Sequence, residues 1–490
     1  METKNSILSF INKDSKTPPY SFIFSELQKP SLIDYNINPN VRRIVREWFH
    51  FYNETNDEIN KTKMANIQGI LCNSNLNIFI NNKAVNIPAT KIKTIYEEYG
   101  PQFIVSLINS ISTGSIDFPY KKYSISDTHL NTLITNTKNF KGSELVKSME
   151  FNLGDIVFSE LTMDLFPNPF KLVDDYQYFK HTDKEYLEID LVTDYFTEDC
   201  RMKSIRADQK PVKMSPYDIW KSGNNLVKDV LLNSLHQSLH NGEDFNMNLL
   251  REEIYNSSSK PDGIKESTQF KVSLAMSVIK YFCHDPSTSS MLDISAGWGD
   301  RLIAAASCGL EHYFACDPND CLKEGHEKIK DYFIPTEKKH LYEIKYEPFE
   351  SATLPDKKYD LVFSSPPFFD LEEYSNESNQ SLVNYKDGNN WLVNFLFVSL
   401  EKAWSKLEVG GHMAIHITDT PTLKICEPMV LFCQAKLPGF SYMGVLGSLG
   451  KAGHVRPIWV FKKTSKTSSG LARDAKKSLK NNFKDISSLI

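Results

Sequence analysis

The segment Ser365-Pro366-Pro367-Phe368 combines a hydroxyl group, a stiff turn and an aromatic ring. It follows Tyr359–Phe363, an apolar run that is typical of a buried strand. Proline lacks an N–H for the strand ladder and has a fixed φ, so we expect the strand to end at this point. The turn then offers hydrogen-bond acceptors on one side and an aromatic face on the other. Taken alone, a Pro-Pro turn is equally at home in an ordinary loop.

A second segment, Asp293 to Arg301, places two glycines between an expected strand and an expected helix. Gly297 and Gly299 allow a sharp turn and let a ligand approach the backbone, while the helix start offers free N–H groups. A dinucleotide fingerprint needs a third glycine at position 302, which is Leu302 here. The loop favours a nucleotide-like cofactor other than NAD, and a plain tight turn is the alternative.

An acidic residue, Asp317, comes directly after the next expected strand. A carboxylate in this place is suited to accept hydrogen bonds from two ribose hydroxyls. Ligands of open α/β sheets bind at the carboxyl ends of the strands. The glycine loop and Asp317 together therefore predict a nucleoside pocket.

The elements that must position these residues alternate between strand and helix from about residue 185 onward. Such alternation predicts a doubly wound, mostly parallel α/β sheet of the Rossmann-like kind. We expect Gly410-Gly411 to close the long helix that precedes the fifth strand. The expected strands are Met291–Ile294, His312–Cys316, Leu341–Tyr346, Asp360–Phe363 and His412–Ile417, the helices are Arg301–Cys308, Cys321–Phe333 and Asn390–Leu407, and Ser441–Leu446 with Pro457–Phe461 form a closing hairpin.

The chain divides into three parts by composition. Residues 1–184 form a mixed α+β N-terminal region, a candidate for recognising nucleic acid or a partner, with helix-like stretches at Val41–Asn53 and Thr90–Ile111 and a strand-like one at Leu76–Ile80. Residues 185–465 hold the motifs, and residues 466–490 are rich in lysine and read as a basic tail. The tail is a candidate for phosphate contacts or an ordinary solvated terminus.

Bulk composition is that of a globular protein of 490 residues with a formal net charge of −5, which argues against a protein that coats nucleic acid. The eight cysteines show no C-x-x-C pair and lie mostly in apolar runs, so we expect reduced, buried thiols, including Cys316 and Cys321. No secretion signal or membrane span is expected. An intracellular protein is predicted.

Asp293–Gly299, Asp317 and Ser365–Phe368 together resemble the class I S-adenosylmethionine-dependent methyltransferases that methylate exocyclic amino groups of nucleic-acid bases. The wording of both motifs is similar in particular to DNA methylases of bacteriophages and large DNA viruses. The resemblance covers about residues 185–465. It implies a seven-stranded methyltransferase sheet and S-adenosylmethionine as the cofactor. It also implies a nucleic-acid partner, with DNA favoured over RNA. The expected location of the protein is the cytoplasm or nucleus of a virus-infected host.

The resemblance also implies roles for the residues of the cofactor site. Asp293 and the loop Ser295, Ala296, Gly297, Trp298 and Gly299 would hold the methionine end of the cofactor. Asp317, followed by Pro318, would bind the ribose, and Phe349 and Glu350 the adenine. The segments Asp194–Glu198, Ser215–Trp220 and Gln269–Lys271 would close over the cofactor or the substrate.

The same resemblance gives the proline motif a chemical role. The amino group of adenine or cytosine is a poor nucleophile, since its lone pair is delocalised into the ring. The Ser365 oxygen and the Pro366 carbonyl would accept its two hydrogens and direct the lone pair at the methyl group. Pro367 would stiffen this turn, and Phe368 would stack on the flipped base. No metal is required.

Several readings stay open on the sequence alone. Ser365 stands where adenine enzymes more often have Asp or Asn, so adenine N6 is only slightly favoured over cytosine N4. An RNA methyltransferase and a non-catalytic binding subunit are the alternatives, and the oligomeric state is not indicated. The segment from Asp370 to Trp391 is a substrate lid or a surface loop. Lys260–Gly263 as a nucleotidyltransferase motif and His412 with His416 as metal ligands are disfavoured, because their supporting residues are absent.

Overall fold

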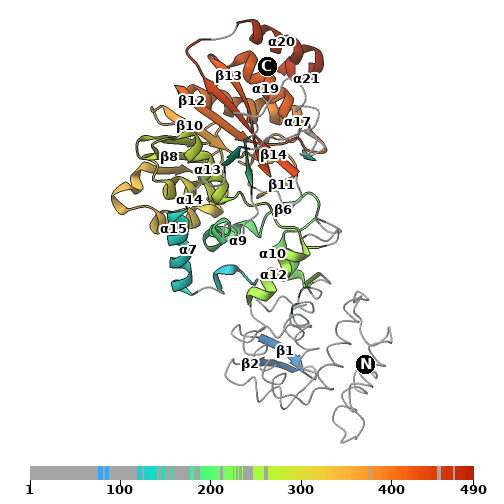
Figure 1. Ribbon diagram of the computed structural model, residues 1–490. Coiled ribbons are helices and arrows are strands. Elements are labelled where there is room, and N and C mark those ends of the chain that lie inside the picture. The colour runs from blue at the N-terminus through green and yellow to red at the C-terminus, as the bar shows by residue number, and fades with distance from the viewer. Residues whose placement is uncertain are drawn as a thin grey trace, which may run out of the picture. The chain divides into compact units, whose positions relative to one another are not determined.

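The protein is described by a computed structural model (Figure 1). Its chain forms two compact units, Met1–Ser124 with Gln209–Glu266 and Ile125–Asp208 with Ser267–Ile490. The predicted helices Val41–Asn53 and Thr90–Ile111, and residues 260–262 of the disfavoured motif, lie outside the described residues. The described residues are 76–80, 83–87, 118–123, 126–140, 146–148, 157–158, 177–180, 188–209, 213–223, 226–227, 230, 234, 247–258, 263–375, 377–449, 454–466 and 469–489.

The second unit is built on a doubly wound sheet with a parallel centre, as the alternation of elements predicts. Its central strands run in the order β9, β8, β7, β10, β12, and each pairs with its neighbour in parallel. Strand β14 is antiparallel to β12 and to β13 beyond it. These seven strands are β7 (Ser290–Asp293), β8 (His312–Cys316), β9 (Tyr342–Lys345), β10 (Tyr359–Ser364), β12 (Leu407–His416), β13 (Phe440–Leu449) and β14 (His454–Lys463).

Three short strands enlarge this sheet beyond the predicted seven. Strand β5 pairs in parallel with β13, β3 pairs antiparallel with β5, and β4 pairs in parallel with β14. They bring the sheet to ten strands among the described residues. Their bounds are β3 (Val146–Ser148), β4 (Val157–Phe158) and β5 (Gln177–Lys180).

Helices cover both faces of the sheet, so the side chains that alternate between the two sides of a strand are buried in two different hydrophobic clusters. In β10, Leu361 and Phe363 belong to one hydrophobic cluster and Val362 to the other. On the face of Leu361 the helices are α7 (Asp127–Asn139), α9 (Asp194–Arg201), α13 (Val272–Phe282), α14 (Asp300–Cys308) and α15 (Lys323–Phe333). On the face of Val362 they are α17 (Gly388–Trp391), η9 (Leu392–Phe397), α18 (Val398–Lys406), α19 (Cys426–Lys436), α20 (Ser469–Asn482) and α21 (Lys484–Leu489).

The helix predicted over Asn390–Leu407 differs from the expectation in two ways. Its first part, η9, is a π-helix, and α18 ends at Lys406 before Gly410-Gly411 is reached. The two glycines lie within β12 instead, where Gly410 has a φ of 97°. A Cβ on Gly411 would lie 2.8 Å from the Asp360 carbonyl oxygen. Gly411 therefore permits β12 to pack closely on β10, Gly410 permits the positive φ, and neither residue caps the helix.

The lysine-rich C-terminal residues form packed helices, and the prediction of a solvated tail is wrong for them. Helices α20 and α21 lie near α19 in Figure 1. Ala475, Leu479 and Ile486 from these helices are buried in the hydrophobic cluster on that face of the sheet. Their lysines line the outer side of an amphipathic helix, which is the usual arrangement at a protein surface.

Smaller elements complete the two units. In the first unit β1 (Leu76–Ile80) forms an antiparallel pair with β2 (Lys83–Ile87), which confirms the predicted strand. The rings of Phe118 and Trp220 lie 5.9 Å apart there. No helix among the described residues is both long enough and apolar enough to span a bilayer. The remaining elements are η2 (Lys121–Tyr123), α10 (Pro216–Ser222), α12 (Met247–Ser257), β6 (Ile205–Arg206), η6 (Pro286–Thr288), η7 (Asp320–Leu322), η8 (Thr336–Leu341), β11 (Glu372–Glu373) and α16 (Ser381–Asn384).

Candidate active site

The glycine loop connects the end of β7 to the start of α14, as predicted. Gly297 and Gly299 have φ values of 60° and 103°, a region that other residues rarely adopt. A Cβ on Gly299 would also lie 2.6 Å from the Ile329 side chain on α15. Any larger residue at position 299 would therefore strain the backbone and push the loop away from α15.

Asp293 organises this loop from beneath. Its carboxylate is fully buried and forms an ion pair with Arg301, with 2.7 Å between Oδ2 and Nε. Tyr313 donates a hydrogen bond to the same oxygen (3.0 Å), and the Ser295 N–H donates to the other (3.1 Å). Arg301 in addition donates to the Ser295 carbonyl. Asp293 thus acts on anything bound here through the loop it fixes.

Asp317 lies at the end of β8 and reaches the glycine loop. Its Oδ2 accepts a hydrogen bond from the Gly297 N–H (2.7 Å) and its Oδ1 one from the Asn319 N–H (3.0 Å). Burial raises the pKa of the Asp317 carboxyl to about 6. The structure therefore brings together the two features from which the sequence predicts a nucleoside pocket.

His326 is a member of this region that sequence reasoning missed. It is fully buried on α15, with Nε2 2.9 Å from the Gly297 carbonyl oxygen and Nδ1 3.2 Å from the Tyr346 hydroxyl. Burial lowers the pKa of His326 to about 4, so the ring is neutral at physiological pH. No sequence motif marks this residue, because its contact depends on how α15 packs on the loop.

Two of the segments predicted to close over the site contact the glycine loop or the start of α14 that follows it. From α9, the Thr197 hydroxyl donates to the Trp298 carbonyl (2.8 Å), and Thr193, the residue before α9, donates to Asp300 at the start of α14 (2.7 Å). Gln269 also donates to Asp300 (3.1 Å), whose pKa burial raises to about 7. The third predicted segment, Ser215–Trp220, belongs to α10 in the other unit.

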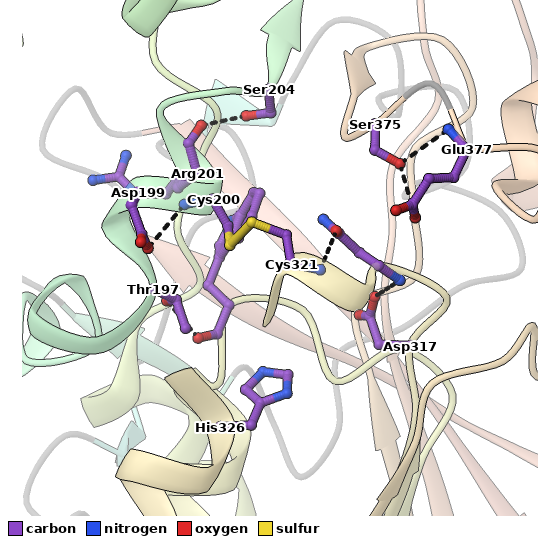
Figure 2. Close-up of a disulfide and its surroundings, with 12 residues drawn as sticks. Thr197, Asp199, Cys200, Arg201, Ser204, Asp317, Cys321, His326, Ser375 and Glu377 are labelled. Carbon is purple, nitrogen blue, oxygen red and sulfur yellow. Dashed lines mark hydrogen bonds between the residues drawn. A yellow bond between two sulfur atoms is a disulfide. The ribbon is translucent and has the colours of Figure 1, made fainter. Parts of the chain in front are cut away.

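A disulfide between Cys200 and Cys321 ties α9 to the turn that follows Asp317 (Figure 2). The Asn319 side chain accepts a hydrogen bond from the Cys321 N–H in the same turn (3.2 Å). The prediction of reduced thiols is wrong for this pair, which is 121 residues apart in sequence. Cys72 lies outside the described residues, and the other five cysteines are free thiols. The cysteines therefore do not support the prediction of a reducing, intracellular compartment.

The proline motif begins where β10 ends, next to the glycine loop. Ser364, the last residue of β10, accepts a hydrogen bond from the Ser295 N–H at 3.2 Å. The next residue, Ser365, is partly exposed, and its Oγ lies 3.0 Å from His416 Nδ1 at the end of β12. Pro366 is buried, and Pro367 and Phe368 are half-buried. The glycine loop and the proline motif thus share one edge of the sheet.

His416 is the second residue that the sequence did not assign to the site. Its ring is buried between aromatic neighbours, with centroid distances of 5.2 Å to Phe270 and 5.6 Å to Phe368. Burial lowers its pKa to about 3, so the ring is neutral. The parallel register of β10 and β12 pairs Ser364 with Ile415 and so brings Ser365 level with His416.

The segment after the proline motif packs onto the same unit. Phe369 has a φ of 49°, unusual for a bulky residue, and its ring lies 5.7 Å from that of Trp391. Strand β11 pairs with β6, and Glu372 accepts a hydrogen bond from the Thr268 N–H (2.7 Å). This segment is therefore anchored at several points and is not a loose surface loop.

The same segment also reaches the predicted adenine subsite. Asn379 donates to the Pro318 carbonyl (3.0 Å), and Tyr385 donates to Glu350 Oε1 (3.2 Å). Glu350 Oε2 and Asn379 Oδ1 are buried without a hydrogen-bond partner among the described residues. Burial also raises the pKa of Glu350. Phe349 is buried, and its carbonyl accepts a hydrogen bond from Lys402 (2.9 Å).

Within the described ranges no group of three or more His, Cys, Asp or Glu side chains is arranged to hold a metal ion. The polar groups of the site are instead carboxylates, backbone N–H groups, a serine hydroxyl and neutral imidazoles. Such groups can bind the hydroxyls and amines of a nucleoside and hold a second ligand beside it.

No protein-family model and no curated protein matches the sequence. Parts of the chain are similar to solved structures: TrmN from Thermus thermophilus (15% identity, TM-score 0.29, 40% of this chain and 49% of that chain), an rRNA methylase from Streptococcus thermophilus (17%, 0.27, 39% and 97%) and a SAM-dependent O-methyltransferase from Thermotoga maritima (14%, 0.27, 41% and 69%). The match spans about half the length of TrmN. At these TM-scores the similarities add nothing to the sheet order given above.

Proposed function

We propose that this protein transfers a methyl group from S-adenosylmethionine to an exocyclic amino group of a nucleic-acid base. The observation that carries the proposal is the hydrogen bond from the Ser295 N–H to Ser364. It joins the glycine loop, where a nucleoside cofactor would bind, to Ser364, the residue directly before the proline motif Ser365–Phe368. Donor and acceptor of the methyl group would therefore meet at one edge of the sheet. Adenine N6 in DNA is the favoured target, on the resemblance of the motifs alone.

The residues around Asp317 fit such a cofactor. Each Asp317 oxygen accepts one backbone N–H and keeps a second lone pair, so the carboxylate can still accept from ribose hydroxyls. The buried Glu350 Oε2 and Asn379 Oδ1 supply acceptors for a base amine. When bound, S-adenosylmethionine would supply an electrophilic methyl group, whose bond to sulfur breaks as the bond to the target nitrogen forms, so that S-adenosylhomocysteine is left and the surplus proton of the methylated amine passes to water. The glycine loop, held by Asp293, would orient its methionine end.

The Ser365 oxygen and the Pro366 carbonyl would each accept a hydrogen bond from one N–H of the target amine. These bonds would turn the lone pair of the amine toward the methyl donor. Pro367 has no N–H to compete for these acceptors and limits the freedom of the turn. Phe368, whose ring is half-buried, would stack on the extruded base, a contact worth about 1–3 kcal/mol. The chain thus supplies position and acceptors, and the cofactor supplies the reactive group.

The test is methyl transfer from radiolabelled S-adenosylmethionine to single-stranded and duplex DNA and to RNA, followed by nucleoside analysis. Label in N6-methyldeoxyadenosine is the expected result. Label in N4-methyldeoxycytidine or in RNA would support amino-group methylation but show that adenine in DNA is not the target. Saturable cofactor binding without transfer to any of these would overturn the proposed enzyme and leave a binding subunit.

Substitutions in the motif test the assigned roles. Ser365→Ala and Phe368→Ala should each lower transfer at least ~100-fold, because they remove an acceptor and a stacking face used in the transition state. The dissociation constant of S-adenosylmethionine should stay within about twofold of the wild type. Ser405→Ala is the matched control, because Ser405 is exposed at the end of α18 and donates only to the Lys402 carbonyl. Full activity in both motif variants would refute the assignment.

A further inference from the structure

The contact between Ser365 and His416 bears on how a serine can serve as the acceptor. A hydroxyl both donates and accepts hydrogen bonds. If nothing else accepted the Ser365 hydrogen, it could point at the substrate amine, although the amine's own N–H groups need acceptors. The 3.0 Å between Ser365 Oγ and His416 Nδ1 offers that hydrogen another acceptor. The direction of this bond therefore decides which face Ser365 presents.

We propose that His416 is the positioning residue that accepts the Ser365 hydroxyl hydrogen at Nδ1, so that the serine lone pairs face the amine to be methylated. This inference rests on the proposed function and deepens it, since it concerns the same site. His416 would carry its own hydrogen on Nε2 and act only through Ser365.

The surroundings of His416 favour this state over the alternatives. Its ring is wedged between Phe270 and Phe368, which restricts its rotation. The charged groups that act on it are Arg456 from β14 and Arg301 from α14, and both oppose a positive charge on the imidazole. With burial, they lower the pKa of His416 to about 3, so Nδ1 stays available as an acceptor across the neutral range.

A spectroscopic test reads the bond directly and needs no activity. Nitrogen NMR of the full chain with labelled histidine should show His416 with Nε2 protonated and Nδ1 shifted as a hydrogen-bond acceptor. The His416→Asn spectrum assigns the signal by its loss. Ser365→Ala should move the Nδ1 shift to that of a free ring nitrogen. A protonated Nδ1, or a shift that ignores Ser365→Ala, would overturn the inference even if the protein never methylates a base.

Kinetics on a single-stranded DNA oligonucleotide containing adenine provide the second test. His416→Leu should lower kcat about 10- to 100-fold with little change in the KM of either substrate, as expected for a lost hydrogen bond that acts in the transition state. His416→Asn, whose side-chain oxygen takes the place of Nδ1, should recover most of that loss. The Ser365→Ala/His416→Leu double variant should be no slower than Ser365→Ala alone, since His416 acts only through Ser365.

His412→Leu is the matched control. His412 lies in the same strand four residues earlier, and its ring contacts Phe282, 4.9 Å away. It should leave kcat within about twofold of the wild type. If the wild type is active and His416→Leu is unimpaired, the role of His416 is refuted and the proposed function stands. If the wild type is inactive and the NMR result is the expected one, the proposed function is refuted and only the hydrogen bond between His416 and Ser365 stands.

Discussion

The two ends of the candidate site are held in different ways. The cofactor corner, which is the loop 293–299 with Asp317, is fixed by a buried ion pair and by hydrogen bonds to both carboxylates. The acceptor corner, residues 365–369, is fixed by one contact to His416, by ring packing and by a residue with positive φ. The cofactor corner is thus held mainly by charged and polar interactions, and the acceptor corner mainly by packing.

The difference fits two different tasks. A cofactor that is the same in every turnover benefits from a preformed cradle, because no reorganisation is then needed on binding. A base that must be extruded and stacked benefits from a surface with rings and few fixed polar partners. We therefore expect substitutions in the cofactor corner to act mainly on stability, and those in the acceptor corner mainly on turnover.

The largest stability effect is expected from Asp293→Ala. It leaves the Arg301 guanidinium buried without its partner, and breaking one side of a buried pair costs about 3–5 kcal/mol. Urea unfolding of this variant and of Ser365→Ala should show the loss in the first only. Glu324→Ala, in the exposed pair with Lys328, is the control and should change the free energy of unfolding by less than about 0.5 kcal/mol. An equal loss in Ser365→Ala would contradict the contrast between the corners.

Opening the Cys200–Cys321 disulfide should have the next largest effect. The bond closes a loop of 121 residues, and such a cross-link typically adds about 2–4 kcal/mol to stability. Thermal unfolding with and without reductant should show a lower Tm for the reduced protein, together with weaker S-adenosylmethionine binding. In a Cys200→Ser/Cys321→Ser variant the reductant should have no effect. A Tm that reductant leaves unchanged in the wild type would show that the bond does not brace this corner.

The smallest effect concerns the pH dependence of Asp317. Its pKa rises from an ordinary value near 4 to about 6 on folding, so the folded chain holds more protons between these pH values. Its contribution to the free energy of unfolding should therefore fall as pH rises from about 4 to about 6, and be flat above. The ionised carboxylate is the better acceptor for ribose hydroxyls, so cofactor affinity should change in the opposite sense and weaken up to about tenfold at pH 5.

Titration calorimetry between pH 5 and 8 measures this change. Asp300, with a pKa of about 7, also titrates nearby, so the comparison must be with Asp317→Asn. That variant should bind more weakly at pH 8 and show a flatter profile below pH 6. An unaltered profile would remove Asp317 from the cofactor site.

Local signals in the sequence predicted the parts of this site that depend on a single segment. The prolines marked the end of β10, and His312–Cys316 was recognised as a strand with its observed bounds. The approach of Asp317 to Gly297 followed from the rule that parallel strands present their ends at one edge. Segments that carry their own turn or strand chemistry were therefore predictable.

Features that depend on long-range packing could not be predicted from the sequence. His416 meets Ser365 only through the register of two strands, and Cys200 meets Cys321 only once α9 packs beside η7. Gly410-Gly411 has the composition of a helix cap, yet Gly411 is required by the close approach of β12 to Asp360. In each case the deciding contact lies tens of residues away, where no local pattern reports it.

Amide hydrogen exchange with bound ligands tests most directly whether the two corners form one site. We expect S-adenosylhomocysteine to slow exchange in residues 294–299 and 317–319, and the further addition of a single-stranded oligonucleotide to slow exchange at Ser365, Phe368 and Phe369. Protection that skips either corner while both ligands are saturating, or that appears only elsewhere in the chain, would contradict the account.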